Sequence, residues 1–564
     1  MASPGITQKA AFALGFLVYA GIACTGIACT GIACAQPATA LSGNVRSTEE
    51  GLMEGVLVSA HRDGSNITVT VVSDTKGRYT FPTERLQPGH YSLAIRAVGY
   101  DLGGLSAADV APNTSATADL TLRKTSDLSA QLTNAEWMES LPGNASQKQF
   151  LQSCTNCHSL HQPLFSTHTA DEFVAVQERM AHYSAASSLL TPQPLVADRV
   201  TNQGEFLLEK RHDAIRKQAE YLAGVNLSKS ETWGFPLKTF HRPTGRATHV
   251  VITEYDLPEP TRMPHDVVVT PDGTVWYDSF AEQILGKLDP KTGKTVEYTI
   301  PTLKPASPKG SLALRADAAG NIWVGMAYQA AVARFDPKTE TFRVFPVPPE
   351  LNKDYTQTTE VEPTHAQVDG KAWIEDSGTY SIYRLDIASG KYEVFQPFPI
   401  PSPNLYDITT DATNDVYFTV FGRGDIGRVD AKTGAVKTWP TPTPNSAPRR
   451  GALAGDGKLW FGEFHADKVG MFDTNTQGFS EWTPPTPWYF PYDVVADRNG
   501  DAWAGSMMAD RVERLDPKSG TFTEYLLPRP TNMRRSFVDD TTTPVSFWVG
   551  SNHGASIVRL QPTD

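Results

Sequence analysis

The sequence predicts a multidomain, mainly β protein: an N-terminal β-sandwich, a small all-α domain and a C-terminal seven-bladed β-propeller. Three observations lead to this class. Residues 41–123 alternate in short apolar runs broken by turn residues, which is typical of strands. Residues 134–228 instead carry helix caps and a helical spacing of apolar residues. Residues 245–564 repeat an aromatic residue at spacings of 43 to 50, close to the length of a propeller blade.

The first 35 residues are typical of a cleaved export signal. Lys9 supplies a positive charge, an apolar stretch follows, and Ala33 and Ala35 are the small residues that favour cleavage before Gln36. A lipid-anchored protein and an uncleaved membrane anchor are the alternatives. No other segment is long and apolar enough to span a bilayer. We therefore expect a periplasmic protein without a transmembrane span in the mature chain.

Residues 41–123 are expected to form a small antiparallel β-sandwich. Asp74 and Gly77 suit a hairpin turn, while Tyr79, Phe81 and Tyr91 suit the core between two sheets. The segment resembles the carboxypeptidase regulatory-like, or transthyretin-like, domain at Gly55–Val58, Ser73–Phe81, Pro88–Tyr91 and Gly99-Tyr100. The resemblance implies a spacer or docking module without chemistry of its own.

The main chemical signal is the motif Cys-Thr-Asn-Cys-His at residues 154–158. The other three of the five cysteines lie in the predicted export signal, so the mature chain would keep only Cys154 and Cys157. Two thiols spaced in this way can add to the vinyl groups of a haem, and the adjacent imidazole can ligate its iron. The alternatives are weaker. A disulfide would close only a tiny loop, a zinc site needs more ligands, and a thioredoxin-like dithiol needs a strand-to-helix junction.

The helical segment that contains this motif resembles class I cytochrome c over residues 134–228. Asn134, Asn144 and Thr169 are expected to cap its helices. The resemblance implies that Cys154 and Cys157 hold one haem c through thioether bonds. It also implies that the residue after the second cysteine, His158, is the proximal iron ligand.

The resemblance further implies a methionine as the distal iron ligand, and we expect it to be Met180. One alternative is that Met180 only fills the core, as methionine often does. Another is that the distal ligand is Met138, His161, His168 or His182. Phe150 lies one helical turn before Cys154 and is expected to pack against the last helix near Tyr221 and Leu222.

The repeat that begins near residue 245 contains seven units. Their shared aromatic residues are Trp276, Trp323, Trp373, Tyr417, Trp460, Trp503 and Trp548. Each unit has room for four strands, which is the number in a propeller blade. The last unit lacks its closing strand, and we expect residues 248–258 to supply that strand and close the ring.

This repeat resembles the virginiamycin B lyase (streptogramin lyase) family over about residues 245–564. The resemblance implies an elimination that opens a ring ester with a divalent cation such as Mg²⁺. It implies Glu463 and His465 as acid and base residues and Glu481 as the cation-binding glutamate. The family's other active-site histidine matches Gly422 here, so a proton donor or acceptor would be missing. The alternative is that these residues only decorate the mouth of the propeller.

A second set of polar residues recurs once per unit, at the start of the first strand. The set is His265-Asp266, His365, Tyr406-Asp407, Arg449-Arg450 and Tyr492-Asp493. In a propeller these residues would ring one end of the central channel and could bind a small molecule or a cation. The alternative is that the aspartates only cap the turns before the strands.

The sequence thus favours a periplasmic c-type cytochrome fused to a β-propeller. It would transfer electrons to or from a redox partner protein or a small-molecule substrate held by the propeller. The alternatives are an oxidoreductase in its own right, a streptogramin-type lyase and a non-catalytic scaffold. The formal net charge of −12 argues against nucleic acid as a partner.

Overall fold

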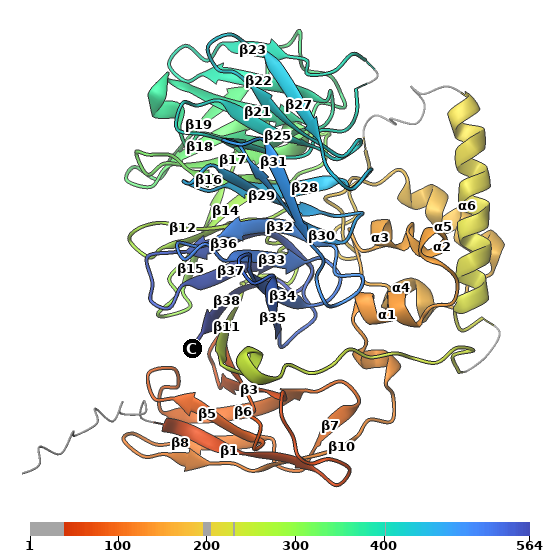
Figure 1. The fold of residues 1–564 in the computed structure, drawn as a ribbon, viewed down its shortest axis with the longest axis vertical. Coiled ribbons are helices and arrows are strands. Elements are labelled where there is room, and N and C mark those ends of the chain that lie inside the picture. The colour runs from red at the N-terminus through yellow and green to blue at the C-terminus, as the bar shows by residue number, and fades with distance from the viewer. Residues whose placement is uncertain (1–38, 196–204, 229–231, 401) are drawn as a thin grey trace, which may run out of the picture. The chain divides into compact units, whose positions relative to one another are not determined.

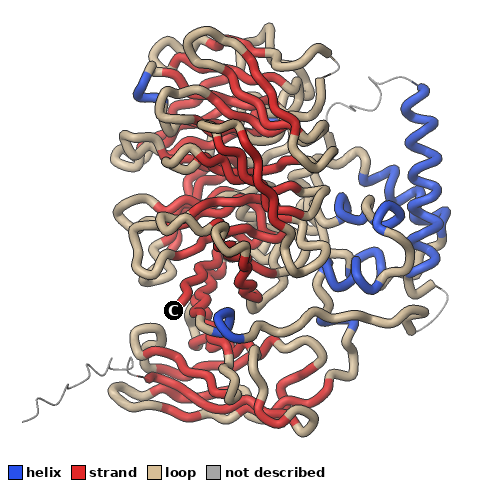
Figure 2. The backbone as a smooth tube through the Cα atoms, viewed as in Figure 1, coloured by secondary structure: helices blue, strands red, loops and turns tan. Residues whose placement is uncertain are grey.

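The computed structural model describes residues 39–195, 205–228, 232–400 and 402–564. The predicted export signal and its cleavage site lie outside these residues. Residues 39–564 form one compact unit, in which strands predominate and the longer helices gather in one segment (Figure 2). Within the described chain, none of the helices combines the length and the apolar character that a membrane crossing requires.

The N-terminal sandwich consists of two sheets around one apolar core. The first sheet contains β1 (Thr39–Ser47), β2 (Gly51–Leu52), β5 (Arg78–Pro82), β7 (Tyr100–Gly103), β9 (Ala116–Thr117) and β10 (Leu120–Lys124). The second contains β3 (Leu57–Arg62), β4 (Ile67–Val72), β6 (Gly89–Arg96) and β8 (Ala107–Val110). Tyr79, Phe81 and Tyr91 are buried in the core as expected. The predicted turn is also confirmed: the amide of Gly77 donates to the carbonyl of Asp74 at 2.8 Å.

Helices follow the sandwich. They are α1 (Asn134–Ser140), α2 (Ala145–Lys148), α3 (Leu151–Cys154), α4 (His161–Leu164), α5 (Ala170–Met180) and α6 (Glu205–Val225). Short 3₁₀ turns lie at Ser129–Gln131, Gly245–Thr248, Ala327–Gln329 and Ala366–Val368. Asn144 and Thr169 cap α2 and α5 as predicted. The cap predicted at Asn134 is wrong by one residue, because Thr133 forms a reciprocal capping box with Glu136 at the third helical position.

The helical segment shares its apolar core with the propeller. The ring of Phe150 packs edge-on against Tyr221 on α6, with ring centroids 5.8 Å apart, as predicted. Leu222 lies in the same buried cluster, which continues into the propeller at Phe490 and Met508. The helices therefore do not enclose a core of their own, and the propeller supplies part of the surface against which they fold.

Six four-stranded sheets follow one another along the described propeller residues (Figure 1). The first sheet contains β12 (Val267–Val269), β13 (Val275–Asp278), β14 (Ile284–Leu288) and β15 (Thr295–Thr299). The second contains β16 (Leu312–Ala316), β17 (Ile322–Met326), β18 (Ala331–Asp336) and β19 (Thr341–Pro346). The third contains β20 (Thr358–Glu362), β21 (Lys371–Asp376), β22 (Ser381–Asp386) and β23 (Tyr392–Phe395). The fourth sheet contains β24 (Ile408–Thr410), β25 (Val416–Val420), β26 (Asp425–Val429) and β27 (Val436–Pro440). The fifth contains β28 (Pro448–Leu453), β29 (Lys458–Glu463), β30 (Lys468–Asp473) and β31 (Gly478–Trp482). The sixth contains β32 (Pro491–Ala496), β33 (Ala502–Ser506), β34 (Arg511–Asp516) and β35 (Thr521–Leu526).

The seventh sheet is closed by a strand from the start of the propeller. It contains β36 (Met533–Asp539), β37 (Ser546–Ser551), β38 (Ser556–Pro562) and β11 (Val250–Asp256). β11 pairs antiparallel with β38 from Val250 opposite Pro562 to Asp256 opposite Ser556. This confirms the closing strand predicted at residues 248–258. The seven repeated aromatic residues all lie on the second strand of their sheets and are buried.

β11 also joins the propeller to the sandwich. Its other edge pairs antiparallel with β4, from Val251 opposite Val71 to Tyr255 opposite Ile67. The seventh blade and one sheet of the sandwich are therefore a single eight-stranded sheet. Arg96 on β6 adds an ion pair of 2.7 Å with Asp510 in the sixth blade. The sandwich is thus attached to the propeller by main-chain hydrogen bonds, which no pattern in the sequence indicated.

Candidate functional site

The structure places Cys154, Cys157, His158 and Met180 around one cavity of about 600 Å³. Cys154 ends α3, the other cysteine and the histidine lie in the turn that follows, and Met180 ends α5. Ile215 on α6 also lines this cavity. Four residues that the sequence predicted from one motif and one resemblance therefore face a common space.

The two cysteines are free thiols in a tight turn. The amides of Cys157 and His158 both lie 3.4 Å from the carbonyl oxygen of Cys154. Burial raises the pKa of Cys154 to about 12 and also raises the pKa of Cys157. Both side chains therefore stay protonated at neutral pH. This protonation state does not suit a reactive redox dithiol, which depends on a stabilised thiolate.

The imidazole of His158 has the tautomer that a metal ligand needs. Its Nδ1 lies 2.9 Å from the main-chain carbonyl oxygen of Ser159. Because a carbonyl oxygen only accepts, Nδ1 carries the proton and Nε2 keeps its lone pair. Burial lowers the pKa of His158, which favours this neutral form. A hydrogen bond from one ring nitrogen to a carbonyl is the usual way to orient a histidine whose other nitrogen binds a metal.

Met180 is 39% exposed, so it does not merely fill the core. By contrast, Met138 is completely buried in the helical core. His161 stacks on Phe165 and His168 packs edge-on against Phe173. None of these three residues, nor His182, is among the described residues that line the cavity. The arrangement therefore favours Met180 over the four alternatives, and the residues present fit a covalently bound haem.

Side chains of the seventh blade donate hydrogen bonds to the two residues between the cysteines. The amide Nδ2 of Asn532 donates to the carbonyl of Thr155 at 3.0 Å, and Nη2 of Arg534 donates to the carbonyl of Asn156 at 3.1 Å. Nε2 of His553 lies 3.3 Å from the same Asn156 oxygen. The two residues between the cysteines are therefore held both by the propeller and by α3, where the amides of Thr155 and Asn156 donate to Gln152 and Ser153.

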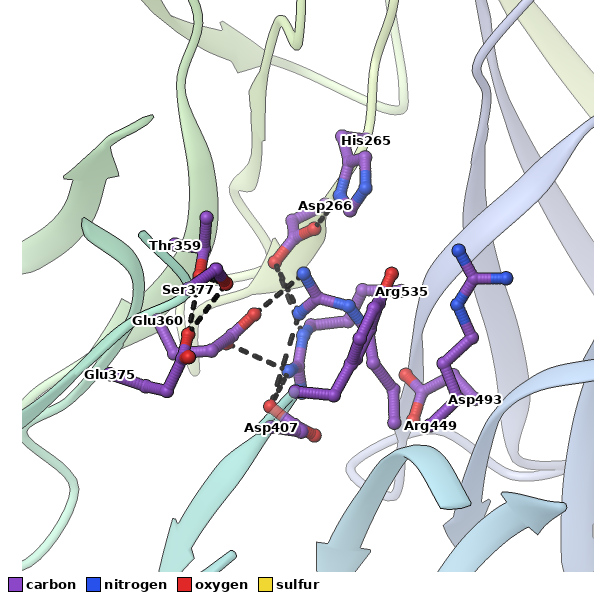
Figure 3. A network of polar contacts seen from close by, with 12 residues as sticks. His265, Asp266, Thr359, Glu360, Glu375, Ser377, Asp407, Arg449, Asp493 and Arg535 are labelled. Carbon is purple, nitrogen blue, oxygen red and sulfur yellow. Dashed lines mark hydrogen bonds and ion pairs between the residues drawn. The ribbon is translucent and has the colours of Figure 1, made fainter. Parts of the chain in front are cut away.

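The recurring polar residues form a buried ion-pair network at one end of the propeller channel (Figure 3). Nη2 of Arg450 lies 2.6 Å from Glu360, and Nη2 of Arg535 lies 3.0 Å from the same carboxylate. Arg535 also pairs with Asp266 at 3.2 Å and with Asp407. Two of these residues, Glu360 and Arg535, were not predicted from the sequence.

The aspartates of the predicted ring link neighbouring blades. Asp266 accepts from the amide of Leu314 in the next blade at 3.0 Å. In the same way Asp407 accepts from Gly451 at 2.9 Å, and Asp493 accepts from Ser536 at 2.8 Å. The structural role proposed for these aspartates as the alternative therefore has direct contacts in its favour.

His365 does not join this ring. It lies after β20, and its Nδ1 is 2.9 Å from Oγ1 of Thr410. The ring position of the third blade is occupied by Glu360, 13 residues before the blade's Trp373, whereas Asp266 precedes Trp276 by 10. The first hairpin of the third blade is longer and contains a 3₁₀ turn, so the start of its first strand was placed too late, at His365, which precedes Trp373 by only 8.

The residues predicted for lyase chemistry are spread over different environments. Glu463 is fully buried at the end of β29, and burial, with Glu481 nearby, raises its pKa to about 8. The Glu481 carboxylate accepts from Lys468 at 2.7 Å and from the Thr443 hydroxyl at 2.7 Å. Burial opposes the charged form of Glu481, but these donors outweigh it and lower its pKa. His465 is exposed, with its ring edge against Phe421.

Two further facts bear on that chemistry. A Cβ atom at Gly422 would lie only 2.8 Å from the amide nitrogen of Asn404, so the missing histidine would not fit there without movement of the backbone. Among the described residues, no three His, Cys, Asp or Glu side chains are grouped closely enough to hold a metal ion. The assignment of a divalent cation to Glu481 stays a prediction.

Comparisons with known proteins support two parts of the chain. Residues 397–564 match the virginiamycin B lyase family, and residues 40–123 match the carboxypeptidase regulatory-like domain. The chain therefore carries a regulatory-like β-sandwich and a virginiamycin B lyase-like β-propeller, as predicted. Neither match covers residues 134–228, so the class I cytochrome c domain stays a prediction. No curated protein matches the chain.

Solved structures with a similar fold include two lyases. The virginiamycin B lyase from Staphylococcus aureus is 22% identical, with 55% of this chain and 99% of that chain covered and a TM-score of 0.48. A streptogramin B lyase is 23% identical, with 56% and 99% covered and a TM-score of 0.48. The extracellular domain of a putative hybrid two component system from B. thetaiotaomicron is 19% identical, with 53% and 40% covered and a TM-score of 0.41.

Proposed function

We propose that this protein is a periplasmic electron carrier whose helical segment holds one covalent haem c. The observation that carries the proposal is the cavity of about 600 Å³ that Cys154, Cys157, His158 and Met180 line together. A zinc site or a redox dithiol would explain the cysteines and the histidine, but neither would explain an exposed methionine that lines the same cavity.

Each residue has a role that its environment supports. Cys154 and Cys157 would hold the porphyrin by thioether bonds, and Nε2 of His158 and the sulfur of Met180 would ligate the iron. Haem supplies one-electron chemistry when bound, and a thioether ligand raises its reduction potential. Phe150 and Ile215, which line the cavity, would exclude water from it. The contacts of Asn532 and Arg534 with residues 155 and 156 would fix the turn that carries both thiols.

The test is covalent attachment. We expect protein matured in a haem-attaching periplasm to gain the mass of one haem and to show a reduced-minus-oxidised haem c spectrum after denaturation. The double variant Cys154→Ser/Cys157→Ser should lose both, whereas Ser153→Ala, which changes a neighbouring lining residue, should keep them. A wild-type polypeptide of unmodified mass from such a host would exclude the proposal.

A lyase activity is the second candidate, because residues 397–564 match the virginiamycin B lyase family. Glu463, with a pKa of about 8, would be a proton carrier near neutral pH. The test is ring opening of a streptogramin B in the presence of Mg²⁺ by the wild type, Glu463→Gln and His465→Ala. Activity that both substitutions abolish supports the lyase. Equal and negligible rates in the three proteins exclude it.

A further inference from the structure

We propose that the mouth of the propeller channel contains a binding site for a small organic carboxylate, held by Arg449 and Arg534. These residues line a second cavity, of about 240 Å³, together with Tyr406, Tyr492 and His265. Asn156 and Ala185 line both this cavity and the larger one beside the cysteine motif. The site is defined by protein side chains alone and does not depend on haem.

The first argument is that Arg449 and Arg534 lack a direct carboxylate partner. Arg450 and Arg535, by contrast, are paired with Asp266, Glu360 and Asp407. Arg449 and Arg534 are only 7% and 2% exposed. Among the described residues, no carboxylate forms an ion pair with either guanidinium, and no dashed contact reaches Arg449 in Figure 3. Burying a cation without a counter-charge costs free energy. An anion that enters the cavity would therefore be stabilised, because it would form the ion pairs that these two arginines lack within the protein.

The second argument is the set of donors that remain free. Arg449 donates to the sulfur of Met507 at 3.5 Å, and Arg534 donates to the same sulfur at 3.6 Å and to Asn156. A thioether is a weak acceptor, so most of the donors of both guanidinium groups are available. The Nε atoms of both arginines are buried and have no hydrogen-bond partner. Two guanidinium groups with unused donors suit a carboxylate, which accepts several hydrogen bonds at once.

The third argument is the positive electrostatic potential inside the cavity. The hydroxyl of Tyr492 lies 2.8 Å from the Tyr406 hydroxyl and 3.2 Å from Nε2 of His265. Burial would raise the pKa of Tyr492, but Arg449, Arg450 and Arg534 outweigh burial and lower this pKa to about 8. A cavity in which a buried phenol loses its proton more easily than in water favours negative charge.

Part of the wall is apolar and suits a small carboxylate with an apolar body. Phe280, Leu312 and Ala327 supply an apolar wall. The guanidinium of Arg449 lies 4.1 Å from the centre of the Tyr492 ring and 4.2 Å from that of Phe464, so it is held in place by aromatic faces. A volume of about 240 Å³ is below the range that drug-sized ligands occupy. Benzoate has the required charge, size and apolar body.

The experiment is calorimetric titration of the full-length protein with benzoate and with benzamide, which has a similar shape and no charge. We expect saturable binding of benzoate, and binding of benzamide that is about ten- to hundredfold weaker, because charged hydrogen bonds are lost. Arg449→Gln should weaken benzoate by a similar factor, and Arg449→Lys, which keeps the charge, by less. Arg343→Gln, an exposed arginine of the second blade, is the matched control and should bind as the wild type does.

Three results would overturn the proposal. They are no saturable binding of benzoate, equal binding of benzoate and benzamide, and unchanged benzoate binding in Arg449→Gln. A second measurement covers the case of a misfolded variant. Without benzoate, Arg449→Met should melt at or above the wild-type temperature, since it removes an unpaired buried charge, and benzoate should then no longer raise its Tm. Neither readout involves electron transfer, so failure here is distinct from failure of the proposed function.

Discussion

Arg534 donates a hydrogen bond of 3.1 Å to the main-chain carbonyl of Asn156, the residue just before the second cysteine of the motif. One side chain of the seventh blade therefore contacts the proposed haem-attachment turn and also lines the cavity at the channel mouth. A buried positive charge so near the proposed haem should affect the energy of adding an electron to it.

The first prediction concerns this charge. Arg534→Gln keeps a donor for Asn156 but removes the charge, so the reduced state loses favourable electrostatic energy. We expect the reduction potential to fall by about 40 mV, which corresponds to about 1 kcal/mol for one electron. Spectroelectrochemical titration measures it, with Arg343→Gln as a control. A potential equal to that of the wild type would show that the arginine does not influence the redox centre.

The second prediction concerns Met180. Met180→Ala should leave covalent attachment intact, because both thiols remain, but it should lower the reduction potential and open the distal side to carbon monoxide. Met138→Leu, a volume-conserving change in the core, is the control and should do neither. Optical spectra under carbon monoxide distinguish the two variants. If Met138→Leu and not Met180→Ala opened the site, the assignment of the distal ligand would be wrong.

The third prediction concerns the buried Glu463. Its pKa of about 8 in the folded protein lies above the ordinary value of 4.5, so the unfolded state loses its proton first as the pH rises. Stability is therefore greatest at low pH and is lost between pH 4.5 and 8, by about 2 to 5 kcal/mol in total. Glu463→Gln, which does not ionise, should lack this loss. The exposed Glu350→Gln should behave as the wild type.

Urea unfolding at pH 5, 7 and 9 measures the effect. The difference in unfolding free energy between Glu463→Gln and the wild type should rise with pH and stop rising above pH 8. Curves that stay parallel over this range would mean that the carboxyl is ionised in the folded protein.

The fourth prediction concerns the shared strand β11. Thr253 lies opposite Val69 on one side and Arg559 on the other. Thr253→Pro removes a ladder amide from the middle of a central strand, and we expect it to destabilise the protein by about 3 kcal/mol or more. Thr253→Val keeps the amide and the β-branched shape and is the control. Calorimetry should show one joint transition of sandwich and propeller in the wild type, and the proline variant should broaden or split it. Separate transitions in the wild type would contradict the joint sheet.

The periodic features of this fold could be predicted because burial enforces them. Each of the seven repeated aromatic residues fills the same place on the second strand of a sheet, so their spacing gave the number of sheets and the need for a closing strand. The polar residues at the end of the channel keep a constant spacing to the repeated aromatic residue only where the first hairpin of the blade has the same length. Asp266 and Asp407 precede their aromatic residues by 10, but Glu360 and Arg535 precede theirs by 13 and were missed.

Contacts between distant segments could not be predicted. The motif of residues 154–158 was predicted from its spacing, and Met180 from a resemblance. The hydrogen bonds from Asn532 and Arg534 to that motif depend on the packing of helices against the seventh blade, which no local sequence pattern encodes. The same holds for the pairing of β4 with β11. Both strands are rich in β-branched residues, which predicts that each is a strand but not which neighbour it pairs with.

The double pairing of β11 sets the order in which the molecule can be completed. Asp256 pairs with Ser556, a partner 300 positions later, so the ring cannot close before nearly the whole polypeptide has left the ribosome. Until β11 docks, β4 presents an unpaired row of amides and carbonyls, the kind of border that recruits strands from other molecules. Such long-range closure is slow. Loss of the last few residues would shorten β38 and leave part of the other edge of β11 unpaired, so trimming at the C-terminus should cause self-association long before it affects the rest of the propeller.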